Sequence, residues 1–119
     1  MKKIIIVDDD VALLDAVKLI FSPALYRVTV LSNGSSILDG NYELPDLFIL
    51  DKQLSGEDGL DICRYLKSHE ITRQIPVIMI SANPNIVRLA KAAGAEAAIE
   101  KPFKMKDLRG SVENLLHGQ

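Results

Sequence analysis

The chain has 119 residues, of which 48% are hydrophobic, and this is enough apolar surface for the core of one ordinary domain. A disordered tail and a multidomain machine are therefore excluded. Fourteen basic and sixteen acidic residues give a net charge of -2, and no basic run is long enough to follow a phosphate backbone. We expect no nucleic-acid partner for this domain.

The apolar runs and the single cysteine indicate where the protein works. The longest aliphatic or aromatic runs, such as 4–7 and 47–50, have four residues, far fewer than the roughly 20 needed to cross a bilayer. Lys2 and Lys3 lead directly into a strand-like run, which is not a signal-peptide pattern. Cys63 has no second cysteine with which to form an internal disulfide, as is usual in a reducing compartment. The sequence predicts a cytoplasmic protein with no membrane partner.

Short apolar runs alternate with segments of helical period along the chain. In chain order the sequence predicts a strand at 3–7, a helix over 13–21, a strand at 27–31, a short helix after Gly34, a surface loop over 39–45, a strand at 47–50, a helix over 58–68, a strand at 77–80, a helix over 85–93, a strand at 97–99 and a helix over 105–116. This alternation is typical of a parallel sheet with helices on both faces. We therefore expect one α/β domain over residues 1–119.

Several polar residues follow directly after the predicted strands. Asp8 and Asp9 follow the first strand, Asp51 the third, Ser81 the fourth and Lys101 the fifth. In a sheet of this kind ligands bind beyond the carboxyl ends of the strands, so these side chains should meet at one edge. Two carboxylates about 4 Å apart repel each other by roughly 4 kcal/mol at an effective dielectric constant near 20. Positive charge must compensate.

Lys101 supplies one positive charge, and a divalent cation is the natural source of the rest. Carboxylate oxygens without a nearby His or Cys suit Mg²⁺ better than zinc. A Mg²⁺ site beside a lysine and a hydroxyl suits the receipt of a phosphoryl group, because phosphoryl transfer depends mainly on alignment and charge neutralisation. Asp51 would then be the acceptor.

Five motifs, each weak alone, occur in order along almost the whole chain. They are IIIVDDD at 4–10, LFILD ending at Asp51, GEDGLDIC around Gly59, VIMISA at 77–82 and EKPF at 100–103. Together they show that the chain resembles a response-regulator receiver domain of two-component signalling. The resemblance implies a flavodoxin-like, three-layer, doubly wound fold with a five-stranded parallel sheet in the order 2-1-3-4-5.

The resemblance also assigns roles to individual residues. It implies that Asp51 is the phosphoacceptor, that Ser81 donates a hydrogen bond to the bound phosphoryl group, and that Lys101 pairs with a phosphoryl or carboxylate oxygen. It further implies that Mg²⁺ is held by Asp8, Asp9, Asp51 and the backbone carbonyl of Gln53. The Lys101-Pro102 bond is expected to be cis, a form that is accessible mainly to X-Pro bonds.

The function implied is that of a phosphorelay switch. A sensor histidine kinase or a phosphotransfer protein would give its phosphoryl group to Asp51, and a partner surface would then change. The domain would not be an enzyme in the usual sense, since it would catalyse only its own phosphorylation and slow dephosphorylation. The downstream partner is not indicated, and either a stand-alone regulator or a piece of a longer one is expected.

The sequence departs from the family pattern at two positions. Ala98 stands where these domains usually carry a Tyr or Phe that responds to phosphorylation. Ser55 stands where a proline commonly follows the acceptor by four residues. The missing aromatic residue leaves open an alternative, a pseudo-receiver that keeps the fold as an interaction module without phosphoryl chemistry.

Two other protein classes share part of this pattern. A flavodoxin-like FMN binder would need a Gly-rich and Ser/Thr-rich phosphate loop after the first strand, where this chain has three aspartates that would repel a phosphate. A haloacid-dehalogenase-type phosphatase also has two acidic residues after its first strand, but its later context differs from the Val11 that follows here. Both classes are therefore disfavoured.

The remaining polar and sulfur-containing residues have ordinary structural interpretations. Asp10 is expected to cap the first helix, and Cys63 to lie in the core. His69 and His117 are expected at the surface, because neither has a partner at metal or triad spacing. The basic residues near the C-terminus are expected to form a solvated helix face; they are Arg88, Lys91, Lys104, Lys106 and Arg109.

Overall fold

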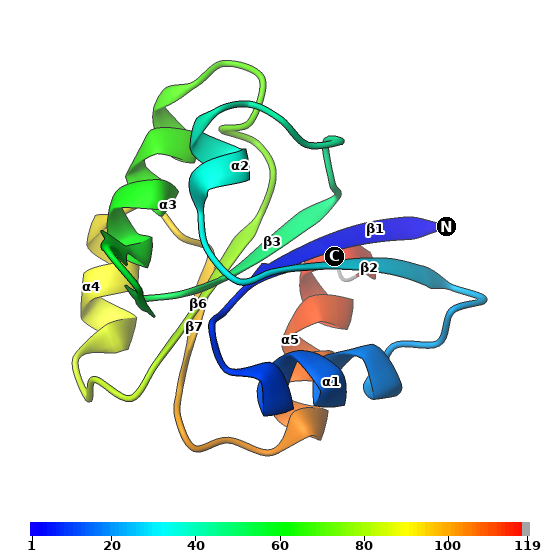
Figure 1. Ribbon diagram of the computed structural model, residues 1–119. Coiled ribbons are helices and arrows are strands. Elements are labelled where there is room, and N and C mark those ends of the chain that lie inside the picture. The colour runs from blue at the N-terminus through cyan, green and yellow to red at the C-terminus, as the bar shows by residue number, and fades with distance from the viewer. Residues whose placement is uncertain (118–119) are drawn as a thin grey trace.

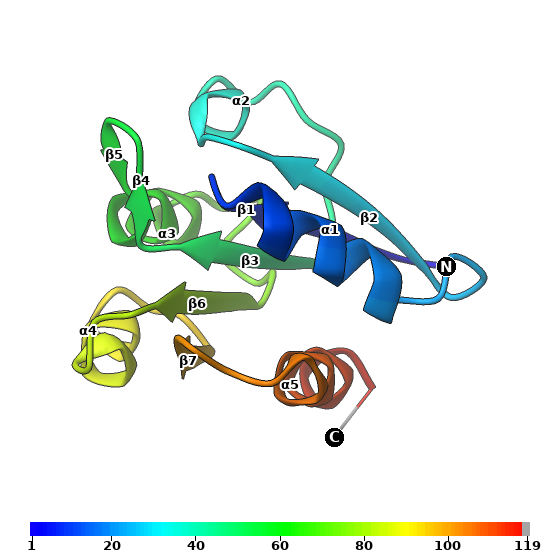
Figure 2. The same cartoon turned by 60° about the horizontal axis from the view of Figure 1, so that its bottom comes forward.

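The computed structural model describes residues 1–117, so the expected domain end at Gln119 lies outside the described residues. Figures 1 and 2 show a parallel sheet flanked by helices. Its five strands lie in the order β2-β1-β3-β6-β7, which confirms the predicted fold class and the order 2-1-3-4-5. The strands are Lys2–Val7 (β1), Tyr26–Leu31 (β2), Leu47–Asp51 (β3), Val77–Ser81 (β6) and Ala97–Glu100 (β7).

All five predicted helices are present, with bounds that differ from the prediction by at most two residues. They are Val11–Ile20 (α1), Ser35–Leu38 (α2), Gly59–Ser68 (α3), Ile86–Ala92 (α4) and Met105–His117 (α5). Helices α1 and α5 cover one face of the sheet, and α2, α3 and α4 cover the other (Figure 2). Over residues 1–117, no helix combines the length and the apolar character that a membrane span requires.

The two hydrophobic cores lie on opposite faces of the sheet because side chains alternate along each strand. In β3, Phe48 and Leu50 pack with α3 and α4, whereas Leu47 and Ile49 pack with α1 and α5. All five residues of β3 are buried, as expected for a central strand covered on both sides. Cys63 lies in the α3 core and is fully buried, as predicted.

The strand register decides which side chains meet at the edge of the sheet. The strand order changes direction at β1, which pairs with β2 on one side and β3 on the other. Such a reversal leaves a crevice at the carboxyl ends of the two central strands. Val7 is paired with Leu50, so Asp8 and Asp51 come next on adjacent strands. Ser81 is paired with Glu100 in the β6–β7 ladder, and Lys101 follows.

A small antiparallel hairpin after β3 was not expected from the sequence. It consists of Gln53–Leu54 (β4) and Glu57–Asp58 (β5). Gly56 turns the chain with φ +77, a conformation that glycine adopts without steric cost. Leu54 anchors the hairpin in the core. Strands of two residues are too short for an alternation pattern, which is why the sequence showed only a loop here.

Candidate functional site

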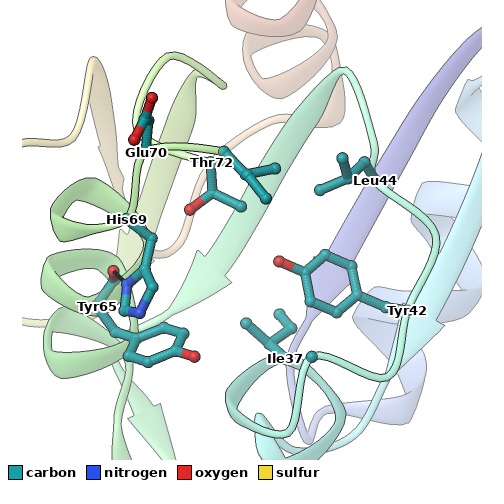
Figure 3. Close-up of a pocket in the computed structure, with 9 residues that line it drawn as sticks. Ile37, Tyr42, Leu44, Tyr65, His69, Glu70 and Thr72 are labelled. Atoms are coloured by element: carbon teal, nitrogen blue, oxygen red, sulfur yellow. Dashed lines mark hydrogen bonds between the residues drawn. The ribbon is translucent and has the colours of Figure 1, made fainter.

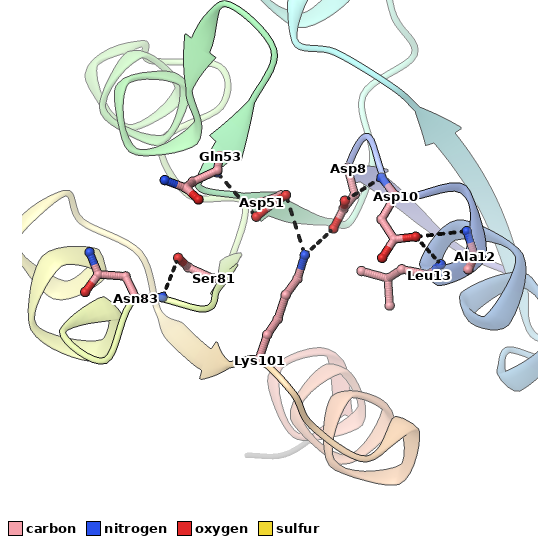
Figure 4. Close-up of polar contacts among 9 residues, drawn as sticks. All are labelled: Asp8, Asp10, Ala12, Leu13, Asp51, Gln53, Ser81, Asn83 and Lys101. Carbon is pink, nitrogen blue, oxygen red and sulfur yellow. Dashed lines mark hydrogen bonds and ion pairs between the residues drawn. The ribbon is translucent and has the colours of Figure 1, made fainter.

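Three carboxylates gather at the carboxyl ends of β1 and β3, and Figure 4 shows two of them, Asp8 and Asp51. One oxygen from each of Asp8, Asp9 and Asp51 lies within 4.8 Å of the others. Asp8 is fully buried and Asp51 is 4% exposed, while Asp9 faces solvent. Residues 43 positions apart in the chain therefore form one acidic site, as the sequence predicted.

The start of α1 holds Asp8 in place. The backbone N–H of Asp10 donates a hydrogen bond to Asp8 Oδ1 at 2.9 Å. The carboxylate of Asp10 in turn accepts hydrogen bonds from Ala12 and Leu13 N–H, at 3.0 and 3.3 Å. This confirms Asp10 as the cap of α1. Asp10 thus serves the helix, and Asp8 and Asp9 remain directed to the acidic site.

Lys101 supplies positive charge to this site. Its Nζ lies 3.2 Å from Asp8 Oδ2 and 3.5 Å from Asp51 Oδ2. Burial works to lower the pKa of Lys101, but attraction by Asp51 and Asp8 outweighs it and the pKa is raised. The lysine therefore stays charged at neutral pH. The Lys101-Pro102 bond that follows is cis, as expected.

One cation does not neutralise three carboxylates, and Asp51 shows the consequence. Burial, together with repulsion from Asp8, raises the pKa of Asp51 from 3.8 to about 6, against the opposing effects of Lys101 and of the Gln53 N–H. A carboxylate with a raised pKa is more basic than an ordinary one, yet Asp51 is still mostly ionised at pH 7. It therefore presents a nucleophilic oxygen anion to the site.

The backbone on the far side of Asp51 is held by a close approach of α3. The N–H of Gly59 donates to the Lys52 carbonyl at 2.7 Å, and a Cβ at position 59 would overlap the Asp51 carbonyl oxygen. Glycine is thus required there for steric reasons. Lys52 pairs with Asp58 at 3.1 Å, and Asp58 caps α3 through the N–H of Leu60.

Ser81 and Gln53 flank Asp51 from two sides. Ser81 is buried, and its Oγ accepts a hydrogen bond from the Asn83 N–H at 3.0 Å. The N–H of Gln53 donates to Asp51 Oδ1 at 3.3 Å. Within residues 1–117 the Ser81 hydroxyl donates no hydrogen bond, so its hydrogen can serve another acceptor. The metal-binding role of the Gln53 carbonyl stays a prediction.

The donor set fits a hard divalent cation. The three side chains offer only carboxylate oxygens, two of them on buried residues whose repulsion Lys101 leaves partly uncompensated. Mg²⁺ prefers oxygen ligands and keeps several of its waters. The exposed Asp9 leaves a route for a hydrated ion to enter. The residues present are therefore compatible with bound Mg²⁺.

A cavity lies away from the acidic site, between the segment after α2 and the C-terminal end of α3 (Figure 3). Its volume is about 940 Å³, and apolar and aromatic side chains, including Tyr42 and Tyr65, line most of it. His69 lies at its rim and is hydrogen-bonded through Nδ1 to the Tyr65 carbonyl oxygen at 2.7 Å. Asp8, Asp9 and Asp51 do not line it, so size alone does not locate the site.

Some residues that shape the site could not be found from the sequence. Glu57 and Asp58 belong to the unexpected hairpin and Lys52 precedes it, and their roles depend on partners that only the folded chain brings near. The GEDG string at 56–59 is typical of the family, but it does not indicate these contacts.

Comparison with known proteins agrees with this geometry. The sequence profile of the response regulator receiver domain matches residues 4–113. The DNA-binding response regulator MtrA of Mycobacterium tuberculosis is 34% identical over 110 residues, which are 90% of this chain and 47% of MtrA. The chain therefore spans about half the length of the curated relatives it matches.

Solved structures show the same fold. A putative response regulator from Chloroflexus aurantiacus has a TM-score of 0.88 and 30% identity, with 97% of each chain covered. The BeF3-activated receiver domain of DrrB, a Thermotoga maritima protein, has a TM-score of 0.85 and 30% identity, with 98% of this chain and 97% of that chain covered. By sequence and by structure, this chain belongs to the response regulator receiver domain family.

Proposed function

We propose that Asp51 accepts a phosphoryl group from a phosphohistidine of a sensor histidine kinase or a phosphotransfer protein. The observation that carries this proposal is a single arrangement. The Asp51 carboxylate is buried beside Lys101 and shares one small site with the oxygens of Asp8 and Asp9. We further propose that residues 1–119 act as one receiver domain in this reaction.

The transfer proceeds by attack of an Asp51 carboxylate oxygen on phosphorus. The new P–O bond forms as the P–N bond to the donor imidazole breaks, and the imidazole leaves with that bond's electron pair and takes up a proton. Lys101 neutralises charge that gathers on the phosphoryl oxygens. The hydroxyl of Ser81 donates a hydrogen bond to one of them. The product is an acyl phosphate on Asp51.

Magnesium would be held by Asp8, Asp9, Asp51 and the Gln53 carbonyl, and it would supply charge neutralisation and alignment of the phosphoryl oxygens. Without it, the incoming phosphoryl dianion would meet three carboxylates and one ammonium group. The chain's own residues thus require a divalent cation in the site for the phosphoryl group to approach.

The consequence of phosphorylation is a change in a partner surface. Ala98 is partly buried on β7, and its side chain is too small to act as the aromatic reporter usual in the family. Ser81 is linked to the start of α4 through the Asn83 N–H, and Asn83 Oδ1 accepts from the Asn85 N–H at 2.8 Å. We propose that movement of Ser81 toward the phosphoryl group reaches the partner surface through α4.

The pseudo-receiver alternative has no support in the site, because Asp51 and Lys101 are both present and paired.

The test is phosphorylation by a small donor. The protein is incubated with acetyl phosphate and Mg²⁺, and its intact mass is measured. The wild type should gain one phosphoryl group, and chelation of Mg²⁺ should prevent the gain. Asp51→Asn should not gain it, whereas Asp61→Asn, a matched change at an exposed site on α3, should behave as the wild type. Uptake of phosphate by Asp51→Asn would refute the assignment of the acceptor.

A further inference from the structure

We propose that Glu57 and the polar cavity beside Asp9 hold the water shell of the cation, so that Glu57 is a positioning residue for Mg²⁺ binding. This inference rests on the proposed function, because it concerns the cation of the same site. It adds residues outside the expected ligands and assigns a role to the β4–β5 hairpin.

The cavity opens next to the acidic site. It has a volume of about 500 Å³ and lies between the loop after β2 and the β4–β5 hairpin. Asp9 is part of its wall, so the cavity adjoins the exposed carboxylate of the cluster. The other lining residues carry hydroxyl, amide or carboxylate groups; they are Ser32, Asn33, Ser35, Ser55 and Glu57.

Glu57 joins the two sides of this cavity. Its Oε1 accepts a hydrogen bond from the backbone N–H of Gly34 at 2.8 Å, which connects the hairpin to the loop before α2. Its second oxygen, Oε2, makes no hydrogen bond or ion pair with any side chain of residues 1–117. One oxygen thus holds the wall together, and the other is available to water.

The wall is packed tightly enough to hold Glu57 in place. A Cβ at Gly34 would overlap Ile62 on α3 and would lie 3.1 Å from Glu57 Oε1. Leu54 anchors the same hairpin in the core, and an ion pair joins Asp58 of β5 to Lys52, the residue before β4. Glu57 is therefore held against Gly34, on the wall of the cavity that Asp9 also lines.

The chemistry of Mg²⁺ explains why such a wall matters. Mg²⁺ releases its waters reluctantly and usually keeps several of them when bound to a protein. Those waters are strong hydrogen-bond donors, and a carboxylate held in the same cavity as Asp9 is a good acceptor for them. Groups that orient ligands from the next layer typically contribute 10- to 100-fold to metal affinity.

The experiment measures the dissociation constant of Mg²⁺ by isothermal titration calorimetry, without a phosphodonor. Glu57→Ala should raise the dissociation constant by about tenfold, since it removes both the wall contact and the free oxygen. Glu57→Gln keeps an oxygen for Gly34 but replaces the free oxygen by an amide NH2 group, which donates hydrogen bonds and accepts none, so it should also raise the constant by about tenfold, and it guards against misfolding of the alanine variant. Glu70→Ala, at an exposed position lining the other cavity, should leave the constant unchanged.

Two further measurements distinguish a role of Glu57 in positioning the cation from an effect on the stability of the fold. The urea midpoints of the metal-free proteins should be similar for wild type and Glu57→Gln, while their Mg²⁺ affinities differ. In ¹⁵N spectra, the Gly34 amide should shift in Glu57→Ala and stay near its wild-type position in Glu57→Gln. A dissociation constant in Glu57→Ala within about twofold of the wild type would overturn the role of Glu57. Failure of the wild type itself to bind Mg²⁺ would refute the metal site, and this inference with it.

Discussion

Replacing Asp51 by asparagine should stabilise the metal-free protein at neutral pH, although it removes the proposed acceptor. The reason is that Asp51 is ionised in a buried site next to Asp8. Asparagine has nearly the same shape and cannot carry the charge. Lys101 keeps its ion pair with Asp8 at 3.2 Å in the variant, so no charge is left without its partner.

The magnitude follows from the raised pKa. The rise of the Asp51 pKa from 3.8 to about 6 corresponds to about 3 kcal/mol, because a tenfold change in proton affinity is worth about 1.4 kcal/mol. The folded state binds this proton more tightly than the unfolded chain does, so ionisation of Asp51 destabilises the fold. This destabilisation is absent below about pH 4 and complete above about pH 6. We expect Asp51→Asn to be more stable than the wild type by about 2 to 3 kcal/mol at pH 7.5.

Urea unfolding followed by circular dichroism, with a chelator present, measures this difference at pH 7.5, 6.0 and 5.0. The advantage of Asp51→Asn should shrink as the pH falls through the range between 6 and 4. Asp61→Asn, which removes an exposed ion pair on α3, should change stability by no more than about 1 kcal/mol. A variant that is less stable than the wild type at pH 7.5, or a gap that does not depend on pH, would refute the reasoning.

Three further substitutions test an ion pair, a packing contact and a hydrogen bond around the acceptor. Lys101→Met leaves the buried Asp8 without its cation, so urea unfolding at pH 7.5 should show a loss of about 3 kcal/mol, opposite in sign to Asp51→Asn. Gly59→Ala should cost about 2 kcal/mol in the same assay, because the added methyl group would overlap the Asp51 carbonyl; equal stability would show that α3 can retreat. Ser81→Ala should slow phosphorylation by acetyl phosphate at least about tenfold while changing stability by about 1 kcal/mol or less. An unchanged rate would remove Ser81 from the site.

The fold was predictable because its signals are local. Each central strand is a run of apolar residues, and each longer helix has an apolar face at helical spacing, so their order along the chain specified a parallel sheet with two covered faces. The hairpin at 53–58 was not predictable, because it depends on contacts between residues and not on a local pattern. It is held by the buried Leu54 and by the Lys52–Asp58 pair, and these contacts leave no periodic pattern.

The expected site residues could be listed from the sequence because parallel strands place their carboxyl ends at one edge. Asp8, Asp51, Ser81 and Lys101 each follow a strand, and a position after a strand is a property of the chain itself. The distances among these side chains, and the rise in the pKa of Asp51 to about 6, could not be predicted from the sequence. They depend on how deeply the charges are buried and on which cation lies beside them.

The amino-acid sequence alone thus determined the order of strands and helices, the sheet that they form and the set of acids, hydroxyl and lysine at its edge. Only the tertiary structure decided that Lys101 pairs with both Asp8 and Asp51, that Gly59 packs against the acceptor backbone, and that Glu57 connects the hairpin to Gly34. Local patterns arise from neighbours in the chain. Electrostatic and steric contacts depend on separations of a few ångströms between residues that lie far apart in sequence.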